Sequence, residues 1–155
     1  MAVIEAGRPA PEFSLARHKT QPFTRADLHG RRTLLVFYPF AFSEICTDQL
    51  SVYNDLLDEF AARGATLYGV SCDATYSQQA FKRSLGVDIE QLSDFEPKGA
   101  ACRAFGVLHP GGFPQRALVL VGPDATIEWS YEAPSPLELP GANLIFDALG
   151  ATPAS

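Results

Sequence analysis

The stretch that decides the fold is Thr33-Leu-Leu-Val-Phe-Tyr-Pro-Phe-Ala-Phe-Ser-Glu-Ile-Cys46. It opens with a nearly continuous run of apolar, β-branched and aromatic residues, which is typical of a strand buried on both faces of a sheet. Pro39 ends this run, because proline lacks the N–H that a sheet ladder requires. From Ser43 to Ala62 apolar residues recur at the spacing of an amphipathic helix, and Ser43 suits its N-cap. The sequence therefore predicts a strand, a break, and a helix with Cys46 in its first turn.

Outward from this stretch, strands and helices alternate along the chain. Further strands are expected around residues 13–15 and at 66–71, 117–121 and 126–131, the last two as a hairpin. Further helices are expected at 74–85, 97–105 and 139–149, and a short helical piece within 20–30. This order predicts an α/β fold with a central mixed β-sheet flanked by helices. Because neither a repeat nor a linker interrupts the pattern, residues 1–155 are expected to form a single domain.

Composition narrows the classes of function. Hydrophobic residues make up 46% of the chain and charged residues 19%, values that allow a sizeable core. The net charge of −6 argues against binding to nucleic acid or to anionic lipid, which both require clustered Lys and Arg. No apolar run approaches the ~20 residues that span a bilayer. The three cysteines, Cys46, Cys72 and Cys102, are too few and odd in number for a disulfide framework, so we expect a cytoplasmic protein.

The position of Cys46 favours a reactive thiol. The first N–H groups of a helix lack partners within the helix, and the helix dipole adds partial positive charge, so a thiolate is stabilised there. A free cysteine is already about 7% thiolate at pH ~7.4, so complete ionisation would multiply the nucleophile only ~10–15-fold. A fast enzyme must therefore also place donors where charge develops on the electrophile.

At this point the sequence resembles a known family. Pro39-Phe-Ala-Phe-Ser43-Glu-Ile-Cys46 resembles the active-site motif of the peroxiredoxins, which is proline, three residues, threonine or serine, two residues, and cysteine. Other segments resemble the family in the same order over roughly residues 7 to 150: Gly-Arg-Pro-Ala-Pro-Glu-Phe-Ser-Leu (7–15), Leu-Leu-Val-Phe-Tyr-Pro (34–39), Gly-Val-Ser-Cys-Asp (69–73), Leu-Ser-Asp-Phe (92–95), Ala-Phe-Gly-Val (104–107), and a strand that begins at Arg116. The compact arrangement resembles the alkyl hydroperoxide reductase E group, whose members often act with a single cysteine.

The resemblance implies a thioredoxin-like fold and a thiol-dependent peroxidase that reduces hydrogen peroxide and organic hydroperoxides. Cys46 would be the peroxidatic nucleophile and would become a sulfenic acid. Arg116 would stabilise its thiolate and donate to the peroxide oxygens. Ser43 Oγ would hydrogen-bond the peroxide, although the family usually has threonine here, and Pro39 would shield the thiolate from water. Neither a cofactor nor a metal ion is implied.

The resemblance also implies partners. An external thiol reductant would regenerate the enzyme: thioredoxin, a glutaredoxin-like protein or a low-molecular-weight thiol. A homodimer is expected.

Cys72 is interpreted as a buried, inert residue. Cys102 is an alternative resolving cysteine, but a one-cysteine cycle is favoured because position 51, where some relatives keep a resolving partner, is serine.

Other interpretations stay open at this point. The same fold could serve as a peroxide sensor or chaperone with little turnover. A cysteine hydrolase that pairs Cys46 with His109 is a weaker hypothesis. His18, His29 and His109 are not spaced to bind a metal ion together. Phe40, Phe42 and Phe113 are interpreted either as core residues or, by resemblance, as the lining of a substrate funnel or dimer interface.

Overall fold

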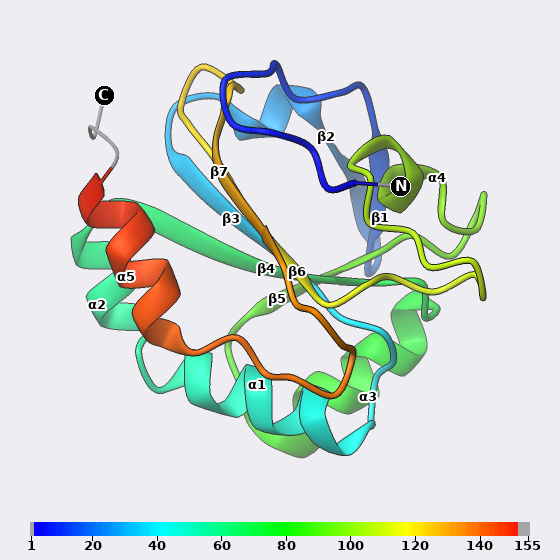
Figure 1. Cartoon of the computed structure of the whole chain (residues 1–155). Coiled ribbons are helices and arrows are strands. Elements are labelled where there is room, and N and C mark those ends of the chain that lie inside the picture. The colour runs from blue at the N-terminus through cyan, green and yellow to red at the C-terminus, as the bar shows by residue number, and fades with distance from the viewer. Residues whose placement is uncertain (1, 152–155) are drawn as a thin grey trace.

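A seven-stranded sheet runs through the centre of the molecule in the computed structural model, which describes residues 2–151 (Figure 1). The strand order is β2-β1-β5-β4-β3-β6-β7. β3 pairs in parallel with β4 and antiparallel with β6, so the sheet is mixed, as predicted. The strands are β1 (Ser14–Arg17), β2 (Thr20–Thr24), β3 (Arg32–Phe37), β4 (Ala65–Ser71), β5 (Glu90–Ser93), β6 (Ala117–Val121) and β7 (Ile127–Glu132).

Helices cover the two faces of the sheet unequally. α1, α2, α3 and α5 gather on one face, whereas the N-terminal segment and α4 lie on the other (Figure 1). The helices are the 3-10 helix η1 (Arg25–Leu28) and the α-helices α1 (Glu44–Asn54), α2 (Leu57–Ala62), α3 (Thr75–Leu85), α4 (Ala100–Ala104) and α5 (Ala142–Ala151). No helix within residues 2–151 combines the length and the hydropathy that crossing a membrane requires.

β3 supplies the core of both faces, as its sequence predicts. Leu34 and Val36 belong to the hydrophobic cluster beneath α1, α2, α3 and α5, because side chains alternate along a strand. Leu35 and Phe37 point to the opposite face and pack in the cluster that contains Phe105. The buried strand is therefore the common wall of two cores.

Two parts of the sequence-based prediction were wrong. The helix expected over residues 43–62 is two helices, because α1 ends at Asn54 and Leu56 has a non-helical φ of −112°. Asn54 Oδ1 accepts the N–H of Asp88 at 2.7 Å, a long-range contact that ties the end of α1 to the segment before β5. The apolar spacing persists across the break because α1 and α2 pack on the same face. Two strands were not predicted. β2 lies in segment 20–30, where only turns and a short helical piece were expected, and the polar residues Glu90 and Gln91 obscure the pattern of β5.

The loop after β3 positions the start of α1. Ala41 N–H donates to Asp73 Oδ2 at 2.8 Å, and Ser71 Oγ donates to the same oxygen at 2.8 Å. Phe42 has a φ of 69°, in the left-handed region that costs a non-glycine residue of order 1–3 kcal/mol. The loop is thus held against the end of β4 while it turns sharply into α1.

Candidate active site

Cys46 lies in the first turn of α1, and its side chain is wholly buried (0% exposed). Arg116 Nη2 donates to Cys46 Sγ at 3.2 Å. The sheet register explains this meeting, because Phe37 at the end of β3 pairs with Ala117 at the start of β6. Arg116 directly precedes Ala117 and is therefore placed beside the helix that follows β3.

Three contacts fix the Arg116 guanidinium, which is only 2% exposed. Besides Cys46, Nε donates to Pro136 O at 2.8 Å and Nη1 donates to Gln49 Oε1. The ion pairs found among residues 2–151 involve Arg17 and Arg32, and none joins Arg116 to a carboxylate. A buried cation without a carboxylate partner favours an anion nearby, and the sulfur of Cys46 is placed to carry that charge.

Gln49 and Tyr53 extend the network along the same face of α1. Gln49 Nε2 donates to the Tyr53 hydroxyl at 3.3 Å, and Tyr53 in turn donates to Pro140 O at 2.6 Å. Burial raises the pKa of Tyr53 to about 12, so its hydroxyl remains a neutral donor. Gln49 was not among the site residues predicted from the sequence. The available signal was a polar residue three positions after Cys46, on the helical face that the apolar stripe assigns to the core.

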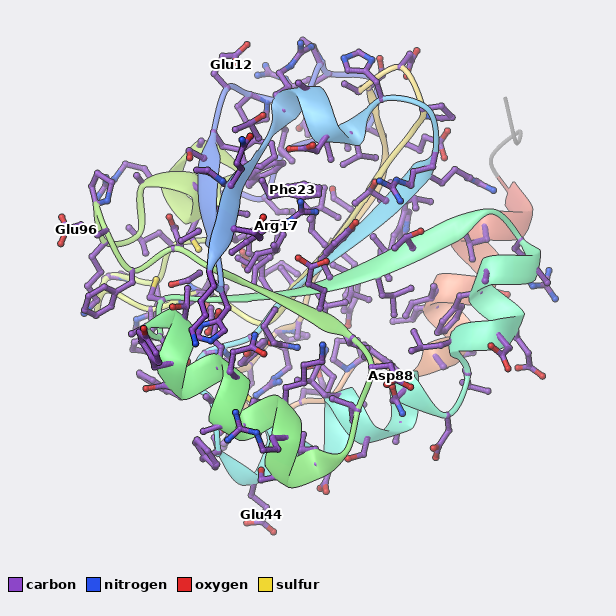
Figure 2. All side chains as sticks on the ribbon, turned by 180° about the vertical axis from the view of Figure 1, so that it is seen from behind. Glu12, Arg17, Phe23, Glu44, Asp88 and Glu96 are labelled. Atoms are coloured by element: carbon purple, nitrogen blue, oxygen red, sulfur yellow. The ribbon has the colours of Figure 1, made fainter. Side chains whose placement is uncertain are left out.

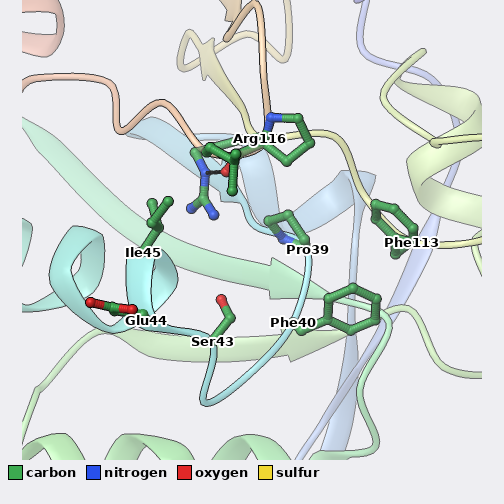
Figure 3. A pocket seen from close by; sticks show the side chains of 9 residues that line it. Pro39, Phe40, Ser43, Glu44, Ile45, Phe113 and Arg116 are labelled. Carbon is green, nitrogen blue, oxygen red and sulfur yellow. Dashed lines mark hydrogen bonds between the residues drawn. The ribbon is translucent and has the colours of Figure 1, made fainter.

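A pocket of about 320 Å³ opens beside the Arg116 guanidinium. Figure 3 shows Ser43 and Pro39 on its wall, with Phe40 and Phe113 at one side. The lining residues are Pro39, Phe40, Ser43, Glu44, Ile45, Phe113, Arg116, Pro136 and Leu137. Three of the four predicted site residues line the pocket; the fourth, Cys46, does not line it but accepts a hydrogen bond from Arg116, which does.

Ser43 occupies the N-cap of α1, as predicted, with a φ of −69° and a ψ of 150°. Its carbonyl accepts the N–H of Thr47 at 2.9 Å, but its hydroxyl makes no capping hydrogen bond. The hydroxyl points into the pocket, on the side of Arg116 (Figure 3). The side chain is therefore available to a bound ligand.

The other two cysteines lie across the sheet from Cys46. Cys72 and Cys102 belong to the cluster that contains Phe37, whereas Cys46 belongs to the cluster beneath α1, α2, α3 and α5. All three cysteines are free. The sheet thus separates Cys46 from Cys102, which argues against direct attack by Cys102 on an oxidised Cys46.

His109 makes contacts away from Cys46. Its Nδ1 accepts the N–H of Gly111 at 2.9 Å, and its ring stacks on Phe113 at 4.2 Å between centroids. This arrangement gives no support to a Cys46–His109 hydrolase. Phe113 and Phe40 also contact each other, at 4.9 Å between ring centroids, and both line the pocket, as a funnel would require.

Comparison with known proteins places this geometry in context. The model of the AhpC/TSA family matches residues 6–130. Alkyl hydroperoxide reductase E of Mycobacterium tuberculosis is 30% identical over 154 residues, which cover 98% of this chain and 100% of the relative. The crystal structure of peroxidoxin BcpB from Mycobacterium tuberculosis superposes with a TM-score of 0.82 at 25% identity, covering 96% of this chain and 97% of that one. Enterococcus faecalis AhpC shares the fold, with a TM-score of 0.85 at 23% identity over 94% of this chain and 90% of that one.

Proposed function

Because the chain belongs to the AhpC/TSA family and is therefore a peroxiredoxin, a thiol-dependent peroxidase, we propose that Cys46 is its peroxide-reducing nucleophile. The observation that carries this proposal is the 3.2 Å contact from Arg116 Nη2 to Cys46 Sγ, beside a pocket of about 320 Å³. A thiolate at this position has a helix N-terminus on one side and a buried guanidinium on the other.

In the proposed reaction the Cys46 thiolate attacks one oxygen of the peroxide. The S–O bond forms as the O–O bond breaks, so two electrons pass from sulfur to the peroxide and Cys46 becomes a sulfenic acid. The departing oxygen takes up a proton and leaves as water or as an alcohol. Negative charge develops on that oxygen in the transition state, where the donors of Arg116 and Ser43 stabilise it.

The pocket suits organic hydroperoxides as well as hydrogen peroxide. Its wall is largely apolar, with Phe40, Ile45 and Leu137 around the Arg116 guanidinium. An alkyl group would lie against these side chains while the peroxide oxygens face Arg116 and Ser43. Pro39 is buried at the base of the loop and would limit the access of water to the sulfur.

An external thiol would regenerate Cys46. The first thiol attacks the sulfenic sulfur and releases water, which leaves a mixed disulfide on Cys46. A second thiol then attacks the sulfur of the first thiol in this mixed disulfide. The two external thiols leave as a disulfide, and Cys46 returns to its reduced state. The position of Cys72 and Cys102 across the sheet supports this one-cysteine cycle. Thioredoxin, a glutaredoxin-like protein or a low-molecular-weight thiol would each supply the electrons.

Exposed apolar residues near the pocket support a homodimer. Phe40 and Leu137 both line the pocket and are 49% and 78% exposed, and Phe42, which precedes α1 and contacts Phe81 instead of lining the pocket, is 57% exposed. Such a group of large apolar side chains is typical of a contact surface.

A cytoplasmic location is also proposed, because a reducing compartment would keep the three thiols free.

Labelling after one equivalent of peroxide tests the assignment of Cys46. A reagent that traps sulfenic acids is expected to modify Cys46 in the native chain, and the Cys46→Ser variant is expected to lose both the label and peroxide consumption. Rapid peroxide consumption by Cys46→Ser would overturn the proposal.

Multiple turnovers with a thiol reductant are expected, whereas a single oxidation that no thiol reverses would favour a sensor. The names of the relatives, which are reductases and peroxiredoxins, do not favour that alternative.

A further inference from the structure

Three polar side chains that the peroxide pocket does not use converge on the opposite face of the sheet. The sulfur atoms of Cys72 and Cys102 and a carboxylate oxygen of Asp94 all lie within 4.8 Å of one another, and all three residues are buried. The ends of β4 and β5 bring two of them together. Ser71, the last residue of β4, pairs with Ser93, the last residue of β5, and Cys72 and Asp94 directly follow these two residues. Cys102 comes from α4.

Asp94 is held rigidly beside Cys102. Its two carboxylate oxygens accept the backbone N–H groups of Ala101 at 3.0 Å and of Cys102 at 2.8 Å. The Cys102 sulfur lies within 4.8 Å of a carboxylate oxygen of Asp94. Despite these donors, burial raises the pKa of Asp94 above the ordinary value for aspartic acid. At this distance from the Cys102 sulfur, the carboxylate can act as a proton acceptor for that thiol.

The two thiols differ in their access to solvent. Cys72 is 8% exposed and lines a second pocket of about 320 Å³, whereas Cys102 is 0% exposed. Pro39, Phe40 and Phe113 line both pockets, so one wall separates this site from the peroxide pocket. An incoming molecule in the second pocket can therefore reach Cys72 but not Cys102.

The charges around the pair also distinguish them. The hydrogen bond with Cys102 lowers the pKa of Cys72, and the Lys98 cation acts in the same direction, while desolvation and the charges of Asp94 and Asp73 oppose them. The same hydrogen bond, together with burial, raises the pKa of Cys102. Cys72, the thiol that lines the second pocket, is therefore assigned the attacking role, and the buried Cys102 the resolving role.

We propose that Cys72 and Cys102 form a second redox centre that exchanges with the disulfides of small thiols, with Cys72 as the attacking thiol, Cys102 as the resolving thiol, and Asp94 as the proton acceptor. This function goes beyond peroxide reduction at Cys46 and does not depend on it. Such an exchange needs an attacking thiol that the disulfide can reach, a second thiol beside it, and a proton acceptor. Cys72, Cys102 and Asp94 are placed to fill these three roles.

The exchange balances as two displacements. The Cys72 thiolate attacks one sulfur of R–S–S–R, so a Cys72–S–S–R bond forms and RS⁻ leaves. Cys102 then gives its proton to Asp94, and its sulfur attacks Cys72 Sγ, which expels the second RS⁻ and forms the Cys72–Cys102 disulfide. Two electrons pass from the protein dithiol to the incoming disulfide, and two external thiols reverse the reaction.

The second pocket favours a small thiol compound that bears a carboxylate. Its charged lining residues are Lys98 and Asp73, and the Asp73 carboxylate already accepts hydrogen bonds from Ala41 N–H and the Ser71 hydroxyl. Gly111 and Gly112 form the turn that faces Lys98. A Cβ built on Gly112 would stand 3.5 Å from Lys98 Nζ, so the amine lies over this turn. A carboxylate on the incoming disulfide could pair with Lys98 while its sulfur approaches Cys72.

Oxidation of the Cys46→Ser variant by oxidised glutathione, a small disulfide with carboxylates, tests the proposal. The protein is first treated with a chelator, because thiol and carboxylate groups this close together would also suit a metal ion. Intact mass is expected to fall by two hydrogens, and peptide mapping is expected to join residues 72 and 102. Adding Cys102→Ser should instead trap glutathione on Cys72. Adding Cys72→Ser should leave Cys102 unmodified.

Variants of Lys98 provide a second test, because a purely structural role of Cys72 and Cys102 would not make the rate of disulfide exchange depend on this charge. Lys98→Met is expected to slow the reaction of Cys72 with oxidised glutathione roughly 3-fold to 10-fold at neutral pH and to shift its pH profile upward. Lys98→Arg should restore most of the rate. With an uncharged disulfide such as hydroxyethyl disulfide, the effect of Lys98→Met should be smaller.

Either of two results would overturn the proposal. One is a mixed disulfide that persists on Cys72 while Cys102 is present, and the other is modification of Cys102 before Cys72. Because these measurements use Cys46→Ser, their failure would leave the assignment of Cys46 unaffected. Peroxide consumption by a chain that keeps Cys46 reports separately on the first site.

Discussion

The guanidinium of Arg116 donates to the sulfur of Cys46 at 3.2 Å, although 70 positions separate the two residues in the chain. The antiparallel pairing of β3 with β6 creates this contact, and Pro136 and Gln49 hold the guanidinium in place. A fixed arginine meets two neighbouring oxygens without reorganising, which is the property that lowers a barrier in a transition state.

Replacement of Arg116 should therefore impair peroxide reduction more than it impairs folding. Arg116→Met is expected to lower kcat/KM for peroxide roughly 100-fold, because it removes both the thiolate's partner and a transition-state donor. Arg116→Lys keeps the charge but not the planar fork, and it should recover only part of the loss. Steady-state kinetics measure both effects, with thermal denaturation as the control for folding. Equal activity of Arg116→Met and the native chain would contradict this role.

Gln49 is expected to act through Arg116. The near-isosteric Gln49→Glu places a carboxylate against the guanidinium, where it would compete with the Cys46 thiolate for the positive charge. We expect the alkylation of Cys46 at neutral pH to slow by about 10-fold. Gln49→Leu removes the acceptor without adding charge, and it should slow alkylation less. Identical alkylation rates in Gln49→Glu and Gln49→Leu would show that charge at this position does not matter.

Ser43 offers a change that raises activity. Ser43→Thr adds the methyl group that restricts χ1, so the hydroxyl should be better oriented toward the peroxide. An increase in kcat/KM of about 2-fold to 5-fold is expected, whereas Ser43→Ala should cost roughly 10-fold because it removes the hydroxyl. The hydroxyl makes no capping bond, so both variants should unfold at nearly the native temperature. A large loss of stability in Ser43→Ala would assign the hydroxyl to the helix instead.

Tyr53 couples the site to the segment before α5. Its hydroxyl donates to Pro140 O at 2.6 Å, and Tyr53→Phe would leave that buried carbonyl without this donor. The expected cost is about 1–2 kcal/mol in the free energy of unfolding. Chemical denaturation measures it, and Tyr76→Phe is a matched control because Tyr76 is 71% exposed. An equal effect of the two substitutions would contradict the contact's contribution.

The sequence predicted the parts of this structure that local patterns encode. The apolar run of β3, the break at Pro39 and the helix start at Ser43 follow from residue type and spacing, and they place Cys46 at a helix N-terminus. The family motif added Arg116, which the spacing of charges alone would not connect with Cys46. β5 was not predicted, because its polar side chains are satisfied by tertiary partners: Gln91 Oε1 accepts the Tyr38 hydroxyl, which lies 53 positions away.

Contacts between residues far apart in the sequence explain why some neighbours at the two sites were not predicted. Gln49 meets Arg116 only because β6 returns beside α1, and Cys72 meets Cys102 only because α4 folds onto the ends of β4 and β5. No local pattern records such meetings. Cys72 is buried, as the sequence predicts, and the proposal that it is reactive rests on a pocket and a second thiol that local sequence does not reveal.

The most direct test of the central claim uses a chain in which Cys46 is the single thiol, Cys72→Ser/Cys102→Ser, mixed rapidly with one equivalent of hydrogen peroxide. We predict the gain of one oxygen on Cys46, at a rate orders of magnitude above that of a short cysteine peptide and strongly reduced by Arg116→Met. A reaction no faster than that of the peptide, in a chain that remains folded, would contradict the account.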